Sequence, residues 1–180
     1  MNIELMPNSH DLFVIKPNIH IDKRGYFLER FQHNLLQEAC GFHIDFIQQN
    51  ESLSSKNVIR GLHYQMQNTQ SKLVTVIKGA VLDVVVDLRK NSSTFAHWWS
   101  IELNSESKNS LFIPKGFAHG FGVLSKEAIF SYMVDASYDP ASEQTILWND
   151  NDLDIDWKIK DPLVSSKDSE GVKFSDATYF

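Results

Sequence analysis

The stretch AVLDVVVDL, residues 80–88, alternates between two sets of side chains and indicates the fold class. Ala80, Leu82 and the other even-numbered positions are all apolar, whereas Asp83 and Asp87 fall on odd-numbered positions. Successive side chains of a β-strand point to opposite faces, so this period of two predicts a strand.

Further short runs of β-branched and aromatic residues lie on both sides of this strand and are separated by turn-forming residues. Only residues 32–39 indicate a helix, and the polar stretch 162–180 is expected to wrap the surface as a C-terminal extension outside the core. Many short, closely spaced strands favour a closed barrel or a double-sheet jelly roll, whose ligand sites lie in the concavity. The predicted strands are residues 72–77, 111–114, 120–124 and 128–134.

The bulk composition is that of an ordinary globular protein. The chain has 180 residues and a net charge of -6, which fits one domain over residues 1–180. The acidic balance argues against nucleic-acid or anionic-membrane partners, but it allows a small anion in a locally basic pocket. Cys40 is the only cysteine, which excludes an intrachain disulfide and a Cys-based zinc site. Without a signal segment or a long apolar run, we expect a cytoplasmic protein.

The segment VIRGLHYQ, residues 58–65, carries several polar side chains in what reads as a strand. Burying them is costly unless they are paired or line a wet cavity, and the alternative is an edge strand with a solvated face. Arg60 and His63 are three residues apart, so strict alternation would place them on opposite faces. A β-bulge near Gly61 would bring them to the same face.

The segment IPKGFAHGF, residues 113–121, has the Pro-x-Gly-x-x-His spacing of the second half-motif of cupin barrels. In metal-binding cupins this histidine, here His119, is joined by a His-x-His pair on an earlier strand. Here that strand has only His63, followed by Tyr64 and Gln65, so too few ligands are available and no metal is expected. Spacing alone favours a structural histidine at a turn for His119.

Taken together, these segments resemble the dTDP-4-dehydrorhamnose 3,5-epimerase family from about residue 17 to residue 168. Ser71, Asn68 and Gln49 depart from the usual pattern, but none is assigned to proton transfer. The resemblance implies an all-β, cupin-type double-stranded β-helix with short flanking helices. It rests on residues 22–25, Phe27, Glu29, Gln48, Asn50, 60–65, 70–74, 113–121, Tyr132, Tyr138, Glu143, 148–150 and 166–168.

The resemblance also implies a cofactor-independent isomerase, active as a homodimer on a dTDP-linked 4-keto-6-deoxyhexose. The implied reaction converts dTDP-4-dehydro-6-deoxy-D-glucose to dTDP-4-dehydro-L-rhamnose, a precursor of L-rhamnose in cell-surface polysaccharide. Three alternatives remain open: a 3- or 5-mono-epimerase on a related sugar, a metal-dependent cupin, and a non-catalytic sugar-binding module.

Four residues are implied in proton transfer next to the ketone. His63 would be the base, and a histidine side chain suits this role because it ordinarily titrates near pH ~6.5. Asp168 would fix its tautomer, Tyr132 would be the acid on the opposite face, and Lys72 would stabilise the enolate. From the sequence alone, Asp168 could be an exposed tail residue, Tyr132 a core tyrosine, and Lys72 a solvated strand end.

The remaining implied residues would bind the nucleotide and the sugar. Arg24, Arg60 and Lys167 are expected to contact phosphate or substrate, since the guanidinium fork of arginine matches phosphate oxygens. Tyr138 is expected to stack on the thymine ring. The other implied substrate contacts are Glu29, Gln48, Asn50, His119 and Glu143.

Overall fold

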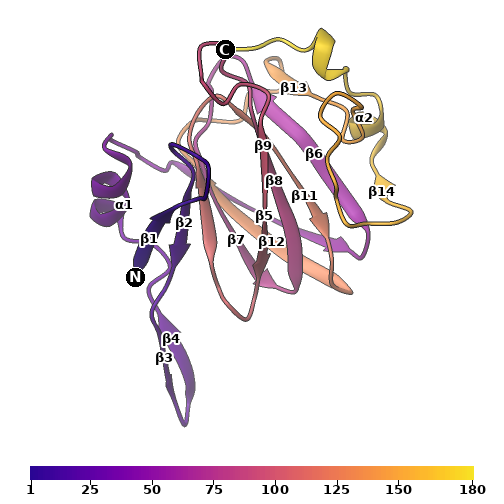
Figure 1. The fold of residues 1–180 in the computed structure, drawn as a ribbon. Helices are drawn as coiled ribbons and strands as arrows, with labels where there is room; N and C mark the ends of the chain where they lie inside the picture. Colours follow the sequence, from indigo (N-terminus) through magenta and orange to yellow (C-terminus); the bar gives the residue numbers. More distant parts are fainter.

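The computed structural model describes residues 1–180 and consists mainly of two β-sheets that face each other (Figure 1). The strands of the first sheet, in chain order, are β1 (Asn2–Leu5), β2 (Phe13–Lys16), β5 (Gln48–Ser55), β7 (Lys72–Lys78), β10 (Ser110–Ile113) and β12 (Glu127–Val134). Those of the second are β6 (Val58–Gln65), β8 (Ala80–Asp87), β9 (Trp98–Asn104), β11 (Phe117–Val123), β13 (Glu143–Thr145) and β14 (Leu163–Val164).

The remaining elements flank the sheets. They are the hairpin β3 (Ile19–Asp22) and β4 (Gly25–Leu28), the helices α1 (His33–Cys40) and α2 (Ser166–Ser169), and a 3-10 turn, η1 (Phe174–Asp176). The spatial order is β1-β2-β10-β7-β12-β5 in the first sheet and β13-β6-β11-β8-β9 in the second, with β14 parallel to β6. No helix is both long and apolar enough to cross a membrane. The predicted all-β jelly roll with short helices is confirmed.

Strand β8 shows why the two sheets pack together. Its odd-numbered side chains, such as Val81 and Val85, belong to the core between the sheets. Its even-numbered side chains, such as Leu82 and Val84, belong to a second apolar cluster on the outer face of the second sheet. The predicted alternation is confirmed, and both faces of the strand are buried. The fold therefore needs a cover over the outer face.

The C-terminal segment supplies that cover (Figure 1). Phe174 is only 9% exposed and joins Trp157 in the cluster that contains Leu82. The expectation that residues 162–180 lie outside the core is therefore wrong for Phe174, which belongs to a buried cluster and contacts the rings of Phe95 and Tyr179. The polar composition of this segment conceals several apolar residues that pack on this cluster, among them Val164, Tyr179 and Phe180.

Helix α1 performs the same role on the first sheet. It begins one residue later than predicted, at His33, and ends before Gly41, which adopts a left-handed conformation with φ of 78°. Leu36 is 1% exposed and packs with Phe112 in a third apolar cluster. Leu36 is the one buried residue of this helix and fixes it to the sheet.

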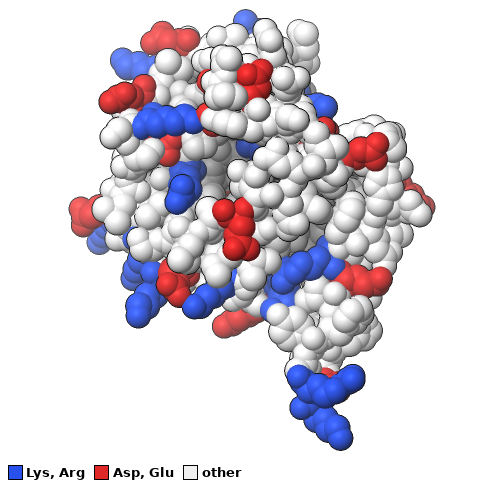
Figure 2. Space-filling model, turned by 180° about the vertical axis from the view of Figure 1, so that it is seen from behind, with Lys and Arg blue, Asp and Glu red and all other residues white.

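The hairpin of β3 and β4 projects away from the sandwich (Figure 1). Ile21 is 80% exposed and Phe27 is 66% exposed. In Figure 2 the hairpin tip carries a cluster of basic side chains, and elsewhere on that face acidic and basic side chains are interspersed. The hairpin contacts the rest of the molecule through Tyr26, whose ring centroid lies 4.1 Å from Nζ of Lys108.

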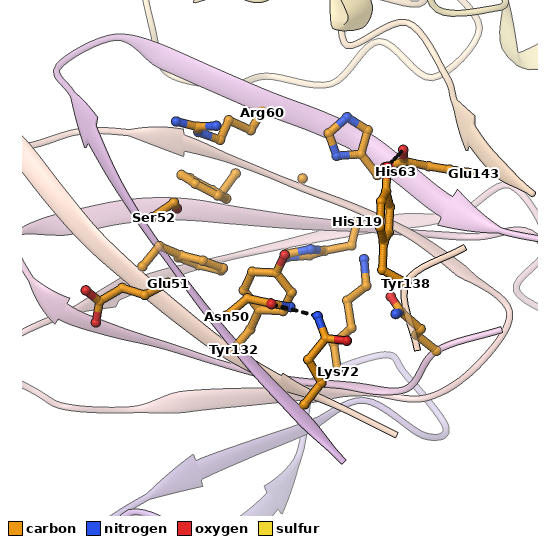
Figure 3. Close-up of a pocket in the computed structure, with 15 residues that line it drawn as sticks. Asn50, Glu51, Ser52, Arg60, His63, Lys72, His119, Tyr132, Tyr138 and Glu143 are labelled. Atoms are coloured by element: carbon orange, nitrogen blue, oxygen red, sulfur yellow. Dashed lines mark hydrogen bonds between the residues drawn. The ribbon is translucent and has the colours of Figure 1, made fainter. Parts of the chain in front are cut away.

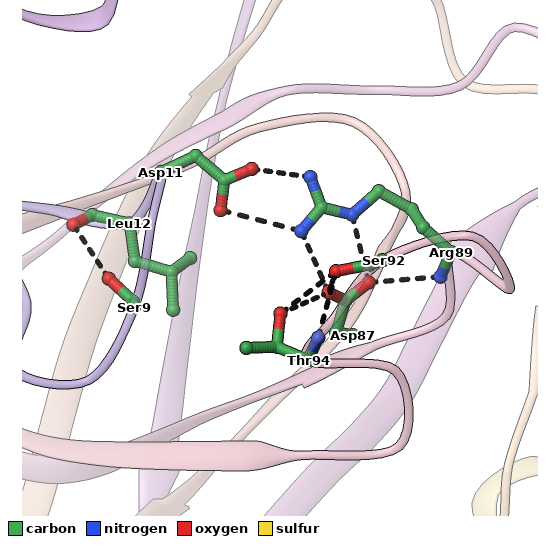
Figure 4. A network of polar contacts seen from close by, with 7 residues as sticks. All are labelled: Ser9, Asp11, Leu12, Asp87, Arg89, Ser92 and Thr94. Atoms are coloured by element: carbon green, nitrogen blue, oxygen red, sulfur yellow. Dashed lines mark hydrogen bonds and ion pairs between the residues drawn. The ribbon is translucent and has the colours of Figure 1, made fainter.

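A polar network joins the N-terminal segment to the end of β8 (Figure 4). Asp87 is fully buried and accepts hydrogen bonds from Arg89, Ser92 and Thr94. Arg89 also pairs with Asp11, and its guanidinium lies 4.4 Å from the ring centroid of Phe117. Both oxygens of the buried carboxylate are therefore hydrogen-bonded.

Candidate active site

A cavity of about 380 Å³ lies between the two sheets and is lined mostly by polar side chains (Figure 3). One wall comes from β5, β7 and β12 of the first sheet, and the other comes from β6, β11 and β13 of the second. The cavity contains nine of the thirteen predicted site residues. They are Gln48, Asn50, Arg60, His63, Lys72, His119, Tyr132, Tyr138 and Glu143.

A bulge in β6 brings Arg60 and His63 to the same cavity. His63 pairs with His119 and Arg60 pairs with Phe121, so three steps along β6 match two steps along β11. Gly61 lies at this irregularity with φ of 124°, and a Cβ there would lie 2.6 Å from the Cα of Gly120. The predicted bulge is confirmed. The alternative of a solvated edge strand is wrong, because β6 lies between β13 and β11.

His63 and Asp168 meet although 105 residues separate them in the chain. Nε2 of His63 lies 2.5 Å from Oδ1 of Asp168, which is only 3% exposed. Burial by itself would raise the pKa of Asp168, but the hydrogen bond and charge of His63, with help from Ser165 and Gly61, lower it. The carboxylate therefore stays charged and holds Nε2, which leaves Nδ1 as the nitrogen able to take a proton. Asp168 is not an exposed tail residue.

Tyr132 lies on the wall opposite His63. It projects from β12 on the same face as Phe130, and it pairs in register with Asn50 of β5. Burial raises the pKa of Tyr132, with a further increase from the negative charge of Glu143, while the Asn50 side chain opposes it. The phenol therefore keeps its proton at neutral pH and can donate it. Its hydroxyl-bearing ring lines the cavity and is not part of a closed core.

Lys72 projects into the cavity from the start of β7, as the parity of this strand predicts. Burial lowers the pKa of its ammonium to about 8, and the negative charges of Asp83 and Glu143 limit the decrease. The side chain therefore carries a positive charge at neutral pH in surroundings poor in water, where one charge acts strongly on a developing oxyanion. It is not a solvated strand end.

His119 and Asp83 form a buried pair beside Lys72. Nε2 of His119 lies 2.9 Å from Oδ2 of Asp83, and Oδ1 of Asp83 has no protein hydrogen-bond partner. Burial raises the pKa of Asp83, against the opposing effect of His119, and burial also lowers the pKa of His119. The expectation of a histidine at a turn is wrong, because His119 lies inside β11.

Polar groups suited to an anionic ligand lie around the remaining wall of the cavity. Arg60 donates one hydrogen bond to Ser54, at 3.0 Å from Nε to Oγ, while its terminal nitrogens have no recorded partner. Tyr138 is 53% exposed and donates to Glu143 at 2.7 Å. Glu143 also pairs with Lys167, and these hydrogen bonds outweigh burial and lower the pKa of Glu143. Lys167 therefore lies next to the cavity without lining it.

Two predicted substrate contacts lie away from the cavity of their own chain. Arg24 is at the hairpin tip, where it bonds Asp22, and Glu29 follows the hairpin and accepts a hydrogen bond from Gln32. The polar residues that sequence reasoning missed are Glu51, Ser52 and Gln70, which line the cavity, and Asp83, which lies beside it. The signal for Asp83 was a carboxylate in an otherwise apolar strand, although its partner was not visible.

The chain is similar to known proteins over most of its length. The family described as dTDP-4-dehydrorhamnose 3,5-epimerase matches residues 8–176. The chain belongs to this family. A dTDP-4-dehydrorhamnose 3,5-epimerase from Shigella flexneri is 46% identical over 171 residues, which cover 94% of each protein. The predicted family and enzyme class, an isomerase, are confirmed.

Two solved structures of the family are very similar to this chain. The dTDP-4-dehydrorhamnose 3,5-epimerase from Elizabethkingia anophelis has 43% identity and a TM-score of 0.94, covering 99% of both chains. A dTDP-6-deoxy-D-glucose-3,5-epimerase from Legionella pneumophila, in complex with dTDP-4-keto-L-rhamnose, has the same identity and TM-score, covering 98% of this chain and 94% of that one. The predicted cupin-type fold is therefore confirmed by structures as well as by sequence.

Proposed function

We propose that this chain inverts C3 and C5 of dTDP-4-dehydro-6-deoxy-D-glucose without a cofactor, giving dTDP-4-dehydro-L-rhamnose. The observation that carries the proposal is the opposition of two proton-transfer groups across one cavity. His63, held by Asp168, lies on the wall formed by the second sheet, and Tyr132 lies on the wall formed by the first. Inversion requires removal of a proton from one face of a carbon and delivery to the other, and this arrangement supplies both groups.

The first step breaks a C–H bond next to the C4 ketone. Nδ1 of His63 takes the proton, and the electron pair moves into a new C=C bond as the ketone oxygen becomes an enolate. Asp168 stabilises the imidazolium through Nε2. The ammonium of Lys72 stabilises the negative oxygen, and removal of one such donor typically costs about 10²–10³-fold in rate.

The second step returns a proton from the opposite face. The hydroxyl of Tyr132 donates to the carbon, the C=O bond reforms, and the configuration is inverted. The resulting phenolate regains a proton from solvent, and His63 loses the one that it took. Asp83 has a positioning role in this scheme, because it holds His119 and supports the positive charge of Lys72. The same groups serve C3 and C5 in turn.

The nucleotide part of the substrate fits the remaining polar groups. The free guanidinium nitrogens of Arg60 suit diphosphate oxygens, and the exposed ring of Tyr138 offers a surface on which thymine can stack. The Legionella pneumophila relative in complex with dTDP-4-keto-L-rhamnose supports a ligand of this class. The sugar would then be contacted by the remaining polar side chains of the cavity, Gln48, Asn50, His119 and Glu143.

The expected homodimer explains the position of the hairpin. Its exposed apolar side chains, Ile21 and Phe27, would be covered by a second copy. Arg24 and Glu29 lie outside their own cavity, so they can contact substrate only if the hairpin of one copy reaches the cavity of another. Light scattering should give a dimer at micromolar concentration, and a stable monomer would contradict this assembly. One domain over residues 1–180 and a cytoplasmic location also stay predictions.

The test is incubation with dTDP-4-dehydro-6-deoxy-D-glucose in deuterium oxide, followed by NMR of the product. We expect deuterium at both C3 and C5, with inverted configuration at both carbons. Inversion at only one carbon would identify a 3- or 5-mono-epimerase, and exchange at neither carbon would contradict the proposal. Turnover should survive exhaustive chelation, whereas its loss together with a stoichiometric metal would favour a metal-dependent cupin.

A further inference from the structure

Three side chains able to bind a metal meet outside the cavity, where α1 begins and the loop after it passes. His33 is the first residue of α1, and His43 and Asp45 lie in that loop. One ligand atom from each lies within 4.8 Å of the other two. Nε2 of His43 is 2.7 Å from Oδ2 of Asp45, and none of the three residues lines the cavity.

The backbone that carries these side chains is anchored in the core. Ile44 lies between His43 and Asp45, is 2% exposed, and packs with Leu36 of α1 in the third apolar cluster. Its amide also donates to Oε1 of Gln37 at 3.3 Å. Ile44 is buried while both of its neighbours are exposed, so the anchored backbone directs the side chains of His43 and Asp45 outward. The side chains of His43 and Asp45 are each 68% exposed and are free to adjust.

Contacts between aromatic rings also place His33 next to His43. The His33 ring meets the His43 ring edge to face, with 5.8 Å between centroids, and it meets Phe31 in a similar way at 6.4 Å. The two imidazoles therefore come from separate segments and are held near one carboxylate. If His43 and Asp45 formed only a surface ion pair, His33 would not need to lie beside them.

We propose that His33, His43 and Asp45 bind one zinc ion per chain, in a site distinct from the active site. Two imidazoles and one carboxylate are a ligand set that zinc accepts, with a water as the fourth ligand. Adjacent ligand atoms around tetrahedral zinc are about 3.3 Å apart. His43 and Asp45, which are exposed, need to separate slightly, and the half-buried His33 needs to approach; rotation of the side chains can supply both movements.

The site would join the start of α1 to the segment that enters β5. This segment leads directly to Gln48 and Asn50 of the cavity, but the zinc ligands themselves contact no cavity residue. Zinc should therefore stabilise the folded chain by mass action without being required for turnover. Because zinc binds neutral imidazole, protons compete with it, and its affinity should fall as the pH is lowered.

The test is calorimetric titration of the chelator-treated, tag-free full chain with zinc chloride at pH 7.5. We expect one site per chain and a Tm that rises with added zinc. His43→Asn and Asp45→Asn should each weaken zinc binding at least about tenfold, since loss of even an outer-sphere partner commonly costs 10–100-fold. His10→Asn, which removes an exposed histidine elsewhere, is the matched control and should bind like the parent.

Cobalt(II) titration gives a second readout, and its result for the parent does not depend on how any variant folds. The parent should show the intense visible bands of a tetrahedral ion with imidazole ligands, and His43→Asn should lose them. Failure of the parent to bind zinc overturns the proposal. So does unchanged zinc affinity in the double variant His33→Asn/His43→Asn, which would place the metal elsewhere. Epimerase turnover in His43→Asn should equal that of the parent, and this readout separates the zinc site from the proposed catalysis.

Discussion

Asp83 and Asp87 lie four residues apart on the same strand and the same face of β8, yet their surroundings are opposite. Asp87 accepts hydrogen bonds from three side chains, and these outweigh burial and lower its pKa (Figure 4). Asp83 has one side-chain partner, His119, and burial raises its pKa. Both are essentially inaccessible to solvent, at 1% and 0% exposed.

The difference shows how one strand can serve stability at one end and chemistry at the other. A buried carboxylate with all its hydrogen bonds made is locked in one protonation state and holds nearby segments together. A buried carboxylate that lacks some of its hydrogen bonds instead acts on the pKa of the groups around it. For Asp83 these groups are His119 and Lys72. Perturbed groups of this kind cluster at active sites. Substitutions in the two regions should therefore separate activity from stability.

The largest expected effect is loss of activity without loss of fold, in His63→Ala. Removing the base should lower turnover by about 10⁴-fold, the upper end of general-base effects, because the same group serves both carbons. Deuterium exchange into substrate should disappear as well. NMR assays with His10→Ala as control test this, and substantial exchange by the His63 variant would show that another group is the base.

The complementary effect is loss of stability without loss of activity, in Arg89→Met. It leaves Asp87 buried without its cationic partner, and we expect the free energy of unfolding to fall by about 2–4 kcal/mol. The lower part of that range is reasonable because the Arg89 side chain is 28% exposed. Turnover per folded molecule should not change, since Arg89 does not line the cavity.

Urea unfolding is the measurement, and Lys78→Met is the matched control. Lys78 pairs with Glu127 on the surface, where side-chain exposures of 61% and 42% limit the expected loss to about 0–1 kcal/mol. Equal losses for the two variants would contradict the structural role of the Arg89 network.

A smaller and more selective effect is expected for Tyr132→Phe. The base and the enolate stabilisation remain, so the enolate forms but returns mainly to its original configuration. Inversion should fall by a factor of about 10² or more, while deuterium still enters recovered substrate if His63 exchanges its proton within the lifetime of the enolate. Phenylalanine keeps nearly the whole ring, so packing should change little.

NMR of recovered substrate and product distinguishes the two processes. A Tyr132→Phe enzyme that inverts both carbons at the parental rate would contradict the assignment. The acid would then be water or another side chain, and Tyr132 would have only a packing role next to Phe130.

Sequence reasoning succeeded where local pattern and family motif agreed. The role that the resemblance implies for Lys72 agrees with its place in the cavity, and the three-residue spacing of Arg60 and His63 required the bulge that Gly61 forms. The pairing of His63 with Asp168 was implied only by resemblance, because no local rule brings together residues 105 positions apart.

It failed where the outcome depends on partners distant in the chain. Asp83 and Asp87 look alike in the sequence, but the partner of Asp83 is His119, 36 residues away, and the pairing of β8 with β11 brings the two together. Asp87 instead bonds Arg89, Ser92 and Thr94 in the turn that follows its own strand. The strands β1 to β5, β9, β13 and β14 were not predicted, because most of them are only two to four residues long and the longer ones, β5 and β9, lack clean alternation. Phe174 was likewise assigned to the surface, since a mostly polar segment hides the apolar side chains that cover the outer face of the second sheet.

The smallest expected effect tests the comparison most directly, because it makes the same substitution at both aspartates. Lys72 is charged below its pKa of about 8, so kcat/KM of the parent should decline above that pH, to roughly a tenth of its plateau about one unit higher. The charge of Asp83 raises the pKa of Lys72. Asp83→Asn removes that charge while keeping the shape, and should move the alkaline decline to lower pH. Asp87→Asn makes the identical change on the same strand face but next to Arg89, so it should reduce the free energy of unfolding and leave the pH profile in place. An alkaline decline that Asp83→Asn does not move, or that Asp87→Asn moves equally, would mean that the decline does not report Lys72 and that the two aspartates do not have separate roles.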